Sequence, residues 1–140
     1  MLFRSHRSRT EAIFAELGLS QNVRFTGGIP EKEKNDLLCR ARIGLSLSYE
    51  EGWGLSINEF LAAGLPVVAY ALPIFDTVFP NQLTGVPVGD KSAAARAILE
   101  LMAAPQRQRE QGMRGRQFVQ RYDFRNVAKQ EFAALQQLFQ

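Results

Sequence analysis

The chain has 140 residues, a mass of 15.7 kDa and a formal net charge of +3, with 46% hydrophobic and 22% charged residues. This length suits one domain, and the composition is that of globular proteins, which excludes a disordered or fibrous chain. No apolar run approaches the roughly 18 residues of a membrane-spanning helix, and the start lacks the apolar core of a secretory signal, so we expect a cytoplasmic protein. The single cysteine, Cys39, and the single histidine, His6, provide neither a disulfide nor a set of metal ligands, so we expect no metal site. We also expect no cofactor.

The first part of the chain alternates helical and strand patterns. Apolar positions within residues 5–17 predict an amphipathic helix that ends at Gly18, and the alternation in 22–26 predicts a strand. Pro30 then begins a second predicted helix, and the apolar run 43–48 predicts a buried strand.

The middle of the chain continues this alternation. A glycine-rich loop at 51–54 leads into a predicted helix over 55–63, which Gly64 ends. Residues 66–71 form the most apolar predicted strand, and 85–88 a short fourth one. Strands alternating with helices through short connections predict an α/β fold, a Rossmann-like parallel sheet with flanking helices.

The last third of the chain is predicted to be helical. Asp90 is a suitable N-cap for a helix over 92–103. Helical patterns then cover about 105–139, with a break near Arg121. We therefore expect residues 1–140 to form a single domain whose C-terminal helices lie at about 105–139.

Arginine is concentrated in one segment of this helical part. Six arginines lie between positions 107 and 125, with only Glu110 and Asp123 as acidic neighbours. A solvated helix face accounts for such a run, and contact with an anionic partner or a membrane surface is the alternative. No zinc-finger, basic-zipper or aromatic stacking motif accompanies the arginines, so nucleic acid is not an expected partner.

The loop 51–54 is the strongest candidate for a ligand site. In parallel α/β sheets, ligands bind beyond the carboxyl ends of the strands, where a loop enters the next helix. Gly52 and Gly54 permit a tight turn and a close approach of the backbone to a ligand, and the helix that begins near Leu55 directs its first amides there, which favours phosphate. A structural turn without a ligand explains a lone Gly-x-Gly pair equally well.

Two carboxylates flank this loop. Glu51 precedes the glycines, and Glu59 lies eight positions later in the predicted helix. The inward stripe of that helix consists of Ile57, Phe60, Leu61 and Gly64, and Glu59 points away from it. A carboxylate near a helix N-terminus can accept hydrogen bonds from a ribose diol, as in dinucleotide-binding folds, whereas an ordinary exposed glutamate is the alternative.

The sequence EGWGLSINEFLAAGLPVVAY, residues 51–70, resembles the Glu-x7-Glu signature of the retaining glycosyltransferases of family 4. Flanking segments extend the resemblance from about Leu17 to Phe139. It implies a GT-B architecture of two Rossmann-like domains facing a cleft, with this chain as the donor-binding half. The implied reaction is hexosyl transfer from a nucleotide-diphosphate sugar to a glycan or a lipid-linked acceptor.

The resemblance also implies roles for individual residues. Glu59 would bind the ribose hydroxyls, the amides of Gly54 and Leu55 the pyrophosphate, and Glu51 the donor sugar near the reacting carbon, as the catalytic residue. Trp53 stands where the family has an aromatic residue that shapes the loop, and simple packing explains it equally well.

One segment departs from the family pattern. Asp76 falls where the family has a glutamate after a Gly-Gly pair, but Leu72 and Pro73 replace both glycines, and Pro73 cannot donate a backbone hydrogen bond. Donor-sugar contacts at Asp76 are therefore less strongly implied than those of the loop 51–54.

By resemblance, the acceptor-binding N-terminal domain and the basic pair that neutralises the pyrophosphate are absent from this sequence. We therefore expect weak nucleotide binding and no robust turnover by this chain alone. The alternative is a non-catalytic binding or assembly module, or a truncated remnant, that completes an enzyme in trans with a companion chain. An open strand edge and an apolar C-terminal stripe predict a homo-oligomer, or else a rearranged sheet in which 22–26 pairs with 43–48.

Overall fold

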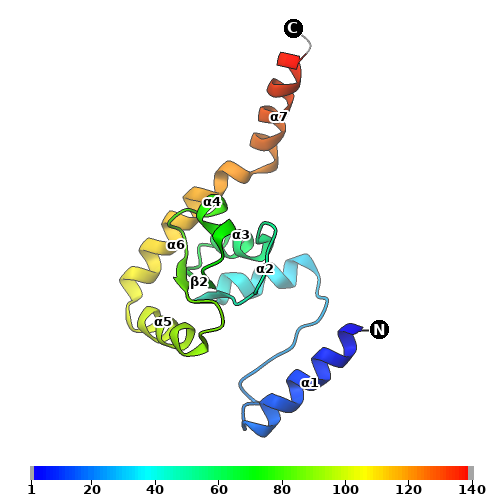
Figure 1. Cartoon of the computed structure of the whole chain (residues 1–140), viewed down its shortest axis with the longest axis vertical. Coiled ribbons are helices and arrows are strands. Elements are labelled where there is room, and N and C mark those ends of the chain that lie inside the picture. The colour runs from blue at the N-terminus through cyan, green and yellow to red at the C-terminus, as the bar shows by residue number, and fades with distance from the viewer. Residues whose placement is uncertain (1, 139–140) are drawn as a thin grey trace. The chain divides into compact units, whose positions relative to one another are not determined.

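The computed structural model describes the backbone of residues 2–138 and the side chains of residues 7–138 (Figure 1). The chain divides into two compact units, Met1–Lys34 and Asn35–Gln140. Within the described residues, no helix has the length and apolarity needed to cross a bilayer.

The first unit is built on helix α1 (Leu2–Glu16). The helix ends as expected at Gly18, which adopts a φ of 68° and donates to the carbonyl of Ala15 at 3.0 Å, while Leu19 donates to that of Phe14 at 2.8 Å. These two bonds form the Schellman motif that glycine favours at helix ends. Helix α2 (Glu31–Arg40) follows after Pro30 and continues into the second unit.

The predicted strand at 22–26 is wrong, because these residues form no strand. The apolar side chains of the segment pack on α1 instead. The ring of Phe25 meets that of Phe14 edge-on with 5.9 Å between centroids, and the guanidinium of Arg7 lies 5.7 Å from the same ring. The alternative in which 22–26 pairs with 43–48 falls with it.

The second unit contains a three-stranded parallel sheet in the order β1-β2-β3. The strands are β1 (Gly44–Ser46), β2 (Val67–Tyr70) and β3 (Thr84–Val86). Helix α3 (Leu55–Ala62) connects β1 to β2, and helix α4 (Pro73–Val78) connects β2 to β3. This arrangement confirms the α/β class with a parallel sheet and flanking helices.

Helices complete the second unit: α5 (Lys91–Ala103), α6 (Pro105–Val119), the 3-10 turn η1 (Gln120–Tyr122) and α7 (Phe124–Leu138). Asp90 is the N-cap of α5, as predicted, since its carboxylate accepts a hydrogen bond from the backbone N–H of Ala93 at 2.8 Å.

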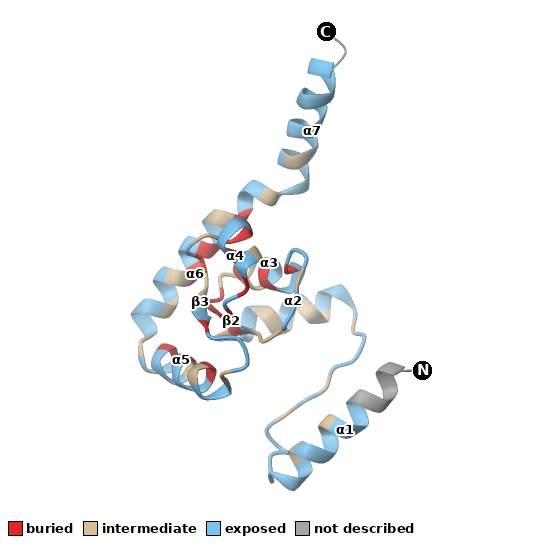
Figure 2. Cartoon of the chain, in the orientation of Figure 1, coloured by how far each residue is buried: buried red, intermediate tan, exposed pale blue. Residues whose placement is uncertain are grey.

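The core lies on both faces of the central strand β2, whose side chains are all buried. Because successive strand residues point to opposite faces, Val67 and Ala69 pack with α3 and α4, whereas Val68 and Tyr70 pack with α5. Figure 2 shows buried residues gathered around the sheet, whereas α7 is exposed along nearly all of its length.

Helix α6 packs on α3 through two glycines. A Cβ on Gly112 would overlap the carbonyl oxygen of Gly64, and a Cβ on Gly115 would lie 2.6 Å from Cδ2 of Leu61. Both glycines are buried. They weaken the intrinsic stability of α6, but they allow its backbone to lie against the carbonyl of Gly64, just beyond α3, and against the side chain of Leu61.

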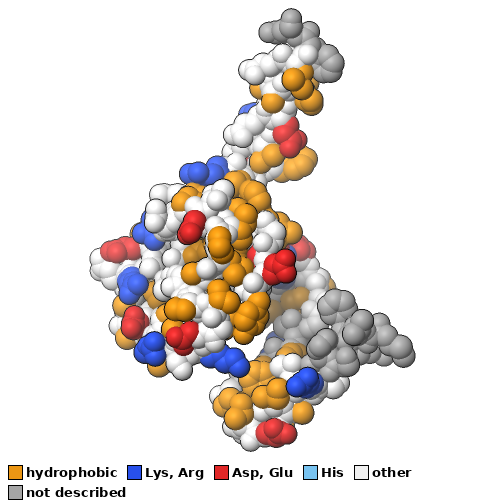
Figure 3. Space-filling model, viewed as in Figure 1, with side chains coloured by type: hydrophobic (Ala, Val, Ile, Leu, Met, Phe, Trp, Pro, Cys, Tyr) orange, Lys and Arg blue, Asp and Glu red, His pale blue; other side chains and the backbone are white. Residues whose placement is uncertain are grey.

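The arginines of α6 do not form a single stripe. Since a helix advances about 100° per residue, Arg107 and Arg114 lie on one flank of the buried glycine face, and Arg109 and Arg116 on the other. On the face of the molecule drawn in Figure 3, basic and acidic side chains are interspersed. This distribution favours the solvated-surface interpretation, and contact with an anionic membrane stays a prediction.

The apolar stripe of α7 is exposed. Its described members are Phe124, Phe132, Leu135 and Leu138, and Phe139, which the prediction also includes, lies outside the described residues. This stripe and the edge of β1 are the features on which the expected homo-oligomer depends, and the oligomeric state stays a prediction.

Candidate functional site

The two glycines of the loop after β1 have different environments. Gly54 is buried and adopts a left-handed conformation, with a φ of 91°, and a Cβ there would lie 3.1 Å from the ring of Phe75 and 3.2 Å from that of Phe79. Gly52 is exposed and has nothing within 4 Å of a Cβ position. The close approach that the structure shows at Gly54 is to the rings of Phe75 in α4 and of Phe79 directly after it, and the approach of a ligand to this backbone stays a prediction.

Helix α3 begins directly after Gly54, as the sequence predicted. Its first backbone bond runs from the N–H of Asn58 to the carbonyl of Gly54 at 3.0 Å. The amides from Leu55 to Ile57 lie in the first turn, where a helix does not use its own N–H groups, and the side chain of Leu55 is exposed. Such amides can donate to phosphate oxygens.

Glu51 lies at the carboxyl end of the sheet. It is half-buried and lines a hollow of about 180 Å³. The other lining residues are Tyr49 and Glu50 from the same loop, and Leu72, Pro73 and Ile74 from the start of α4. Glu51 is thus placed between the segments that follow β1 and β2, which is where ligands bind in parallel α/β sheets.

Glu59 lies on the outer face of α3. Its neighbours Ile57 and Leu61 are fully buried, and Phe60 packs against the same core, which confirms the predicted inward stripe. The side chain of Glu59 is exposed. Its predicted contact with a ribose diol needs a ligand that extends from the loop along the outer surface of α3.

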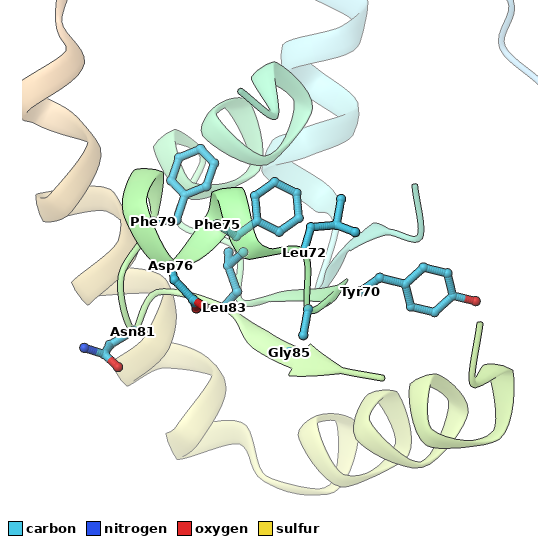
Figure 4. Close-up of a pocket in the computed structure, with 9 residues that line it drawn as sticks. Tyr70, Leu72, Phe75, Asp76, Phe79, Asn81, Leu83 and Gly85 are labelled. Atoms are coloured by element: carbon cyan, nitrogen blue, oxygen red, sulfur yellow. The ribbon is translucent and has the colours of Figure 1, made fainter. Parts of the chain in front are cut away.

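Asp76 belongs to α4, a helix that the sequence reading missed. Pro73 is the first helical residue of α4, a position where the missing N–H costs nothing because the helix would not use it. Asp76 lines a separate hollow of about 170 Å³, together with Phe79, Asn81 and Leu83 (Figure 4). The structure therefore places Asp76 and Glu51 in two different hollows that share only Leu72, and the donor-binding role of Asp76 stays a prediction.

Trp53 packs on Tyr122 of η1. The two ring centroids are 5.0 Å apart with an interplanar angle of 77°. Of the two interpretations of Trp53, packing is therefore the one that the structure shows. Sequence reasoning did not single out Tyr122, because a contact between residues so far apart leaves no local pattern.

Two tyrosines are in contact at the carboxyl end of the sheet. The ring of Tyr49 lies edge-on to that of Tyr70, with 5.5 Å between centroids. Tyr70 is 2% exposed, and its burial, together with Tyr49 and Asp90 nearby, raises the pKa of its hydroxyl above the ordinary 10.0.

This raised pKa predicts a loss of stability in alkaline solution. The unfolded chain ionises Tyr70 at a lower pH than the folded chain does, so the free energy of unfolding falls as the pH rises above about 10. We expect Tyr70→Phe to reduce this fall, measured by urea denaturation between about pH 8 and about pH 11. Equal slopes for the variant and the natural chain would show that Tyr70 does not titrate differently on folding.

Comparison with known proteins identifies the family. The profile described as Glycosyl transferases group 1 matches residues 4–118. The chain belongs to this family. The resemblance to glycosyltransferases is thereby confirmed at the level of group 1, and the GT-B type of fold with it.

Similar proteins are much longer than this chain. Over 121 residues it is 33% identical to phosphatidyl-myo-inositol mannosyltransferase of Mycobacterium leprae, an alignment that covers 81% of this chain and 31% of the relative. Over 130 residues it is 32% identical to the MMP alpha-(1->4)-mannosyltransferase of Mycolicibacterium hassiacum, covering 89% of this chain and 31% of the relative. Among solved structures, sucrose-phosphate synthase from Thermosynechococcus elongatus matches 96% of this chain and 35% of its own, with 34% identity and a TM-score of 0.84. This group 1 domain therefore spans about a third of the length of each of these three proteins.

Proposed function

We propose that this group 1 domain is the donor-binding part of a retaining glycosyltransferase of family 4. The reaction would transfer a hexosyl group from a nucleotide-diphosphate sugar to a glycan or a lipid-linked acceptor. Because both curated relatives compared above are mannosyltransferases, mannose is the first sugar to test. A cytoplasmic location stays a prediction.

The observation that carries this proposal is that Glu51 and the first turn of α3 both lie at the carboxyl end of the sheet. In our assignment, the amides of Gly54 and Leu55 bind the pyrophosphate. Glu59 binds the ribose hydroxyls, and Glu51 contacts the donor sugar near its anomeric carbon. The Gly54 turn supports this assignment because it directs the start of α3 toward the carboxyl end of the sheet.

This arrangement supplies one part of the chemistry of transfer. Negative charge develops on the leaving phosphate as its bond to the sugar breaks, and amides fixed at a helix start stabilise that charge without reorganising. The acceptor hydroxyl must also be held against the anomeric carbon. We assign that task to an acceptor domain or a companion chain, since this chain spans 31% of the similar mannosyltransferases.

A binding or assembly module that completes an enzyme in trans is the second candidate. The exposed apolar stripe of α7 favours it, because monomeric proteins rarely expose a continuous apolar surface without a partner.

The proposal is tested by calorimetry of the 140-residue chain with the diphosphates of uridine, guanosine and adenosine, and with the matching nucleotide-sugars. We expect one nucleotide to bind with a dissociation constant of about 1 mM, and no sugar transfer by the chain alone. Absence of binding by every nucleotide would contradict the donor site. Robust transfer by the purified chain would show that no separate acceptor part is needed.

A further inference from the structure

Two segments that line the hollow of Glu51 are both connected to one residue outside it. The segments are the loop 49–51 and the start of α4. The loop continues into Trp53 and α4 ends at Val78, and Tyr122 of η1 contacts both of these residues.

The ring and the hydroxyl of Tyr122 make separate contacts. The ring lies edge-on against Trp53 at 5.0 Å and against Phe118 of α6 at 6.0 Å. The hydroxyl donates to the carbonyl oxygen of Val78 at 2.8 Å in a partly buried hydrogen bond. Because Val78 is the last residue of α4, its carbonyl has no acceptor role within the helix, and the tyrosine hydroxyl satisfies it.

The loop also packs directly against α4, through Gly54. The rings of Phe75 and Phe79 occupy the space beside Gly54 that a Cβ would enter. The segment Trp53–Gly54 is therefore fixed twice, once against the side of α4 and once through Tyr122 to its C-terminus. Trp53 is 41% exposed, so burial of its own side chain holds this part of the loop only in part.

We propose that Tyr122 is a positioning residue. It fixes the loop 49–54, which contains Glu51, relative to α4, so that the hollow between them is formed before a ligand binds. That the ligand is a nucleotide-sugar rests on the function proposed above. A site that is ordered in advance does not lose affinity to the ordering of its loop on binding.

The chain allows this to be tested without a ligand, because Trp53 is its only tryptophan. Tyr122→Phe removes the hydroxyl and keeps the ring, and Tyr122→Leu removes both contacts. The matched control is Phe124→Leu, two residues further on, where the ring is 85% exposed. The measurements are the emission maximum of Trp53 and backbone hydrogen exchange.

In Tyr122→Phe, we expect the amides at the end of α4 to exchange about fivefold faster, the effect of one net hydrogen bond, with unchanged Trp53 emission. In Tyr122→Leu, we expect faster exchange in both the loop and α4, together with a red shift of Trp53 emission. Helix α5 and the Phe124→Leu control should match the natural chain. Unchanged exchange at α4 in Tyr122→Phe, or an equal increase that includes α5, would overturn the proposal. If Tyr122→Leu does not fold, the exchange of the α4 amides in Tyr122→Phe still tests the proposal.

Nucleotide binding then separates this inference from the proposed function. With the best-binding nucleotide diphosphate, Tyr122→Phe should bind about fivefold more weakly and Phe124→Leu unchanged. If the natural chain binds no nucleotide but the exchange pattern is as expected, the coupling by Tyr122 stands and the donor assignment falls. If nucleotide binds equally to the natural chain and both Tyr122 variants, the positioning role falls and the donor assignment stands.

Discussion

Replacing Gly112 by alanine is expected to lower the free energy of unfolding by about 3 kcal/mol. The new methyl group would overlap the backbone carbonyl oxygen of Gly64, at the end of α3. Alanine favours a helix over glycine by only about 1 kcal/mol, so the steric loss outweighs the gain in helix propensity. The carbonyl cannot rotate away easily, because Gly64 has a φ of 79° and follows the last turn of α3.

Two further substitutions provide the comparison. Gly115→Ala would meet the tip of the Leu61 side chain, which can move, so a smaller loss of about 1 kcal/mol is expected. Gly28→Ala has open space and should change little. Denaturant unfolding of the three variants gives the order. A Gly112→Ala chain as stable as the natural one would show that α6 and α3 are not packed at backbone contact.

Replacing Glu59 by alanine is expected to weaken nucleotide binding by more than about tenfold, which removes a millimolar affinity from the measurable range. Two hydrogen bonds from a ribose diol to a carboxylate are charge-assisted, and each such bond contributes about 1.5–3 kcal/mol. The free energy of unfolding should change little, because Glu59 is on the exposed face of α3, away from the core stripe, and exposed charged contacts contribute little to stability.

Glu100→Ala is the control for this experiment, since Glu100 is also an exposed glutamate on a helix, α5. Calorimetry with the nucleotide that binds best to the natural chain measures the difference, and circular dichroism checks the fold. Equal affinity of the Glu59 variant and the natural chain would exclude the ribose role of this carboxylate. A loss in the Glu100 variant as well would indicate a general effect of charge.

Elements with a local signal were predictable from the sequence. Gly18 and Asp90 mark helix ends through their own backbone preference or hydrogen bond, and β2 is apolar on both faces. The prediction of a strand at 22–26 failed because alternation shows that one face of a segment is apolar without showing what covers that face. Here Phe14 of α1 covers it. Helix α4 was not predicted, because Pro73 was considered only as a residue that cannot donate a backbone hydrogen bond, whereas proline also suits the first position of a helix.

In the candidate site too, local features were predictable from the sequence and contacts with distant residues were not. The loop 51–54 and the outward position of Glu59 follow from glycine spacing and helical periodicity. The contacts of Gly54 with Phe79 and of Trp53 with Tyr122 could not be predicted in this way, because the partners come from distant parts of the chain. The separate hollows of Glu51 and Asp76 also depend on helix α4, which was not among the predicted elements.

The unequal environments of Gly52 and Gly54 bear on how a Gly-x-Gly pattern changes over evolutionary time. A lineage can exchange residue 52 while keeping its backbone, since nothing occupies the space a side chain would take. An exchange at 54 would need a strained φ and a shift of two aromatic rings together. The second glycine is therefore a requirement of folding, and it would persist in descendants of this chain that had lost every ligand.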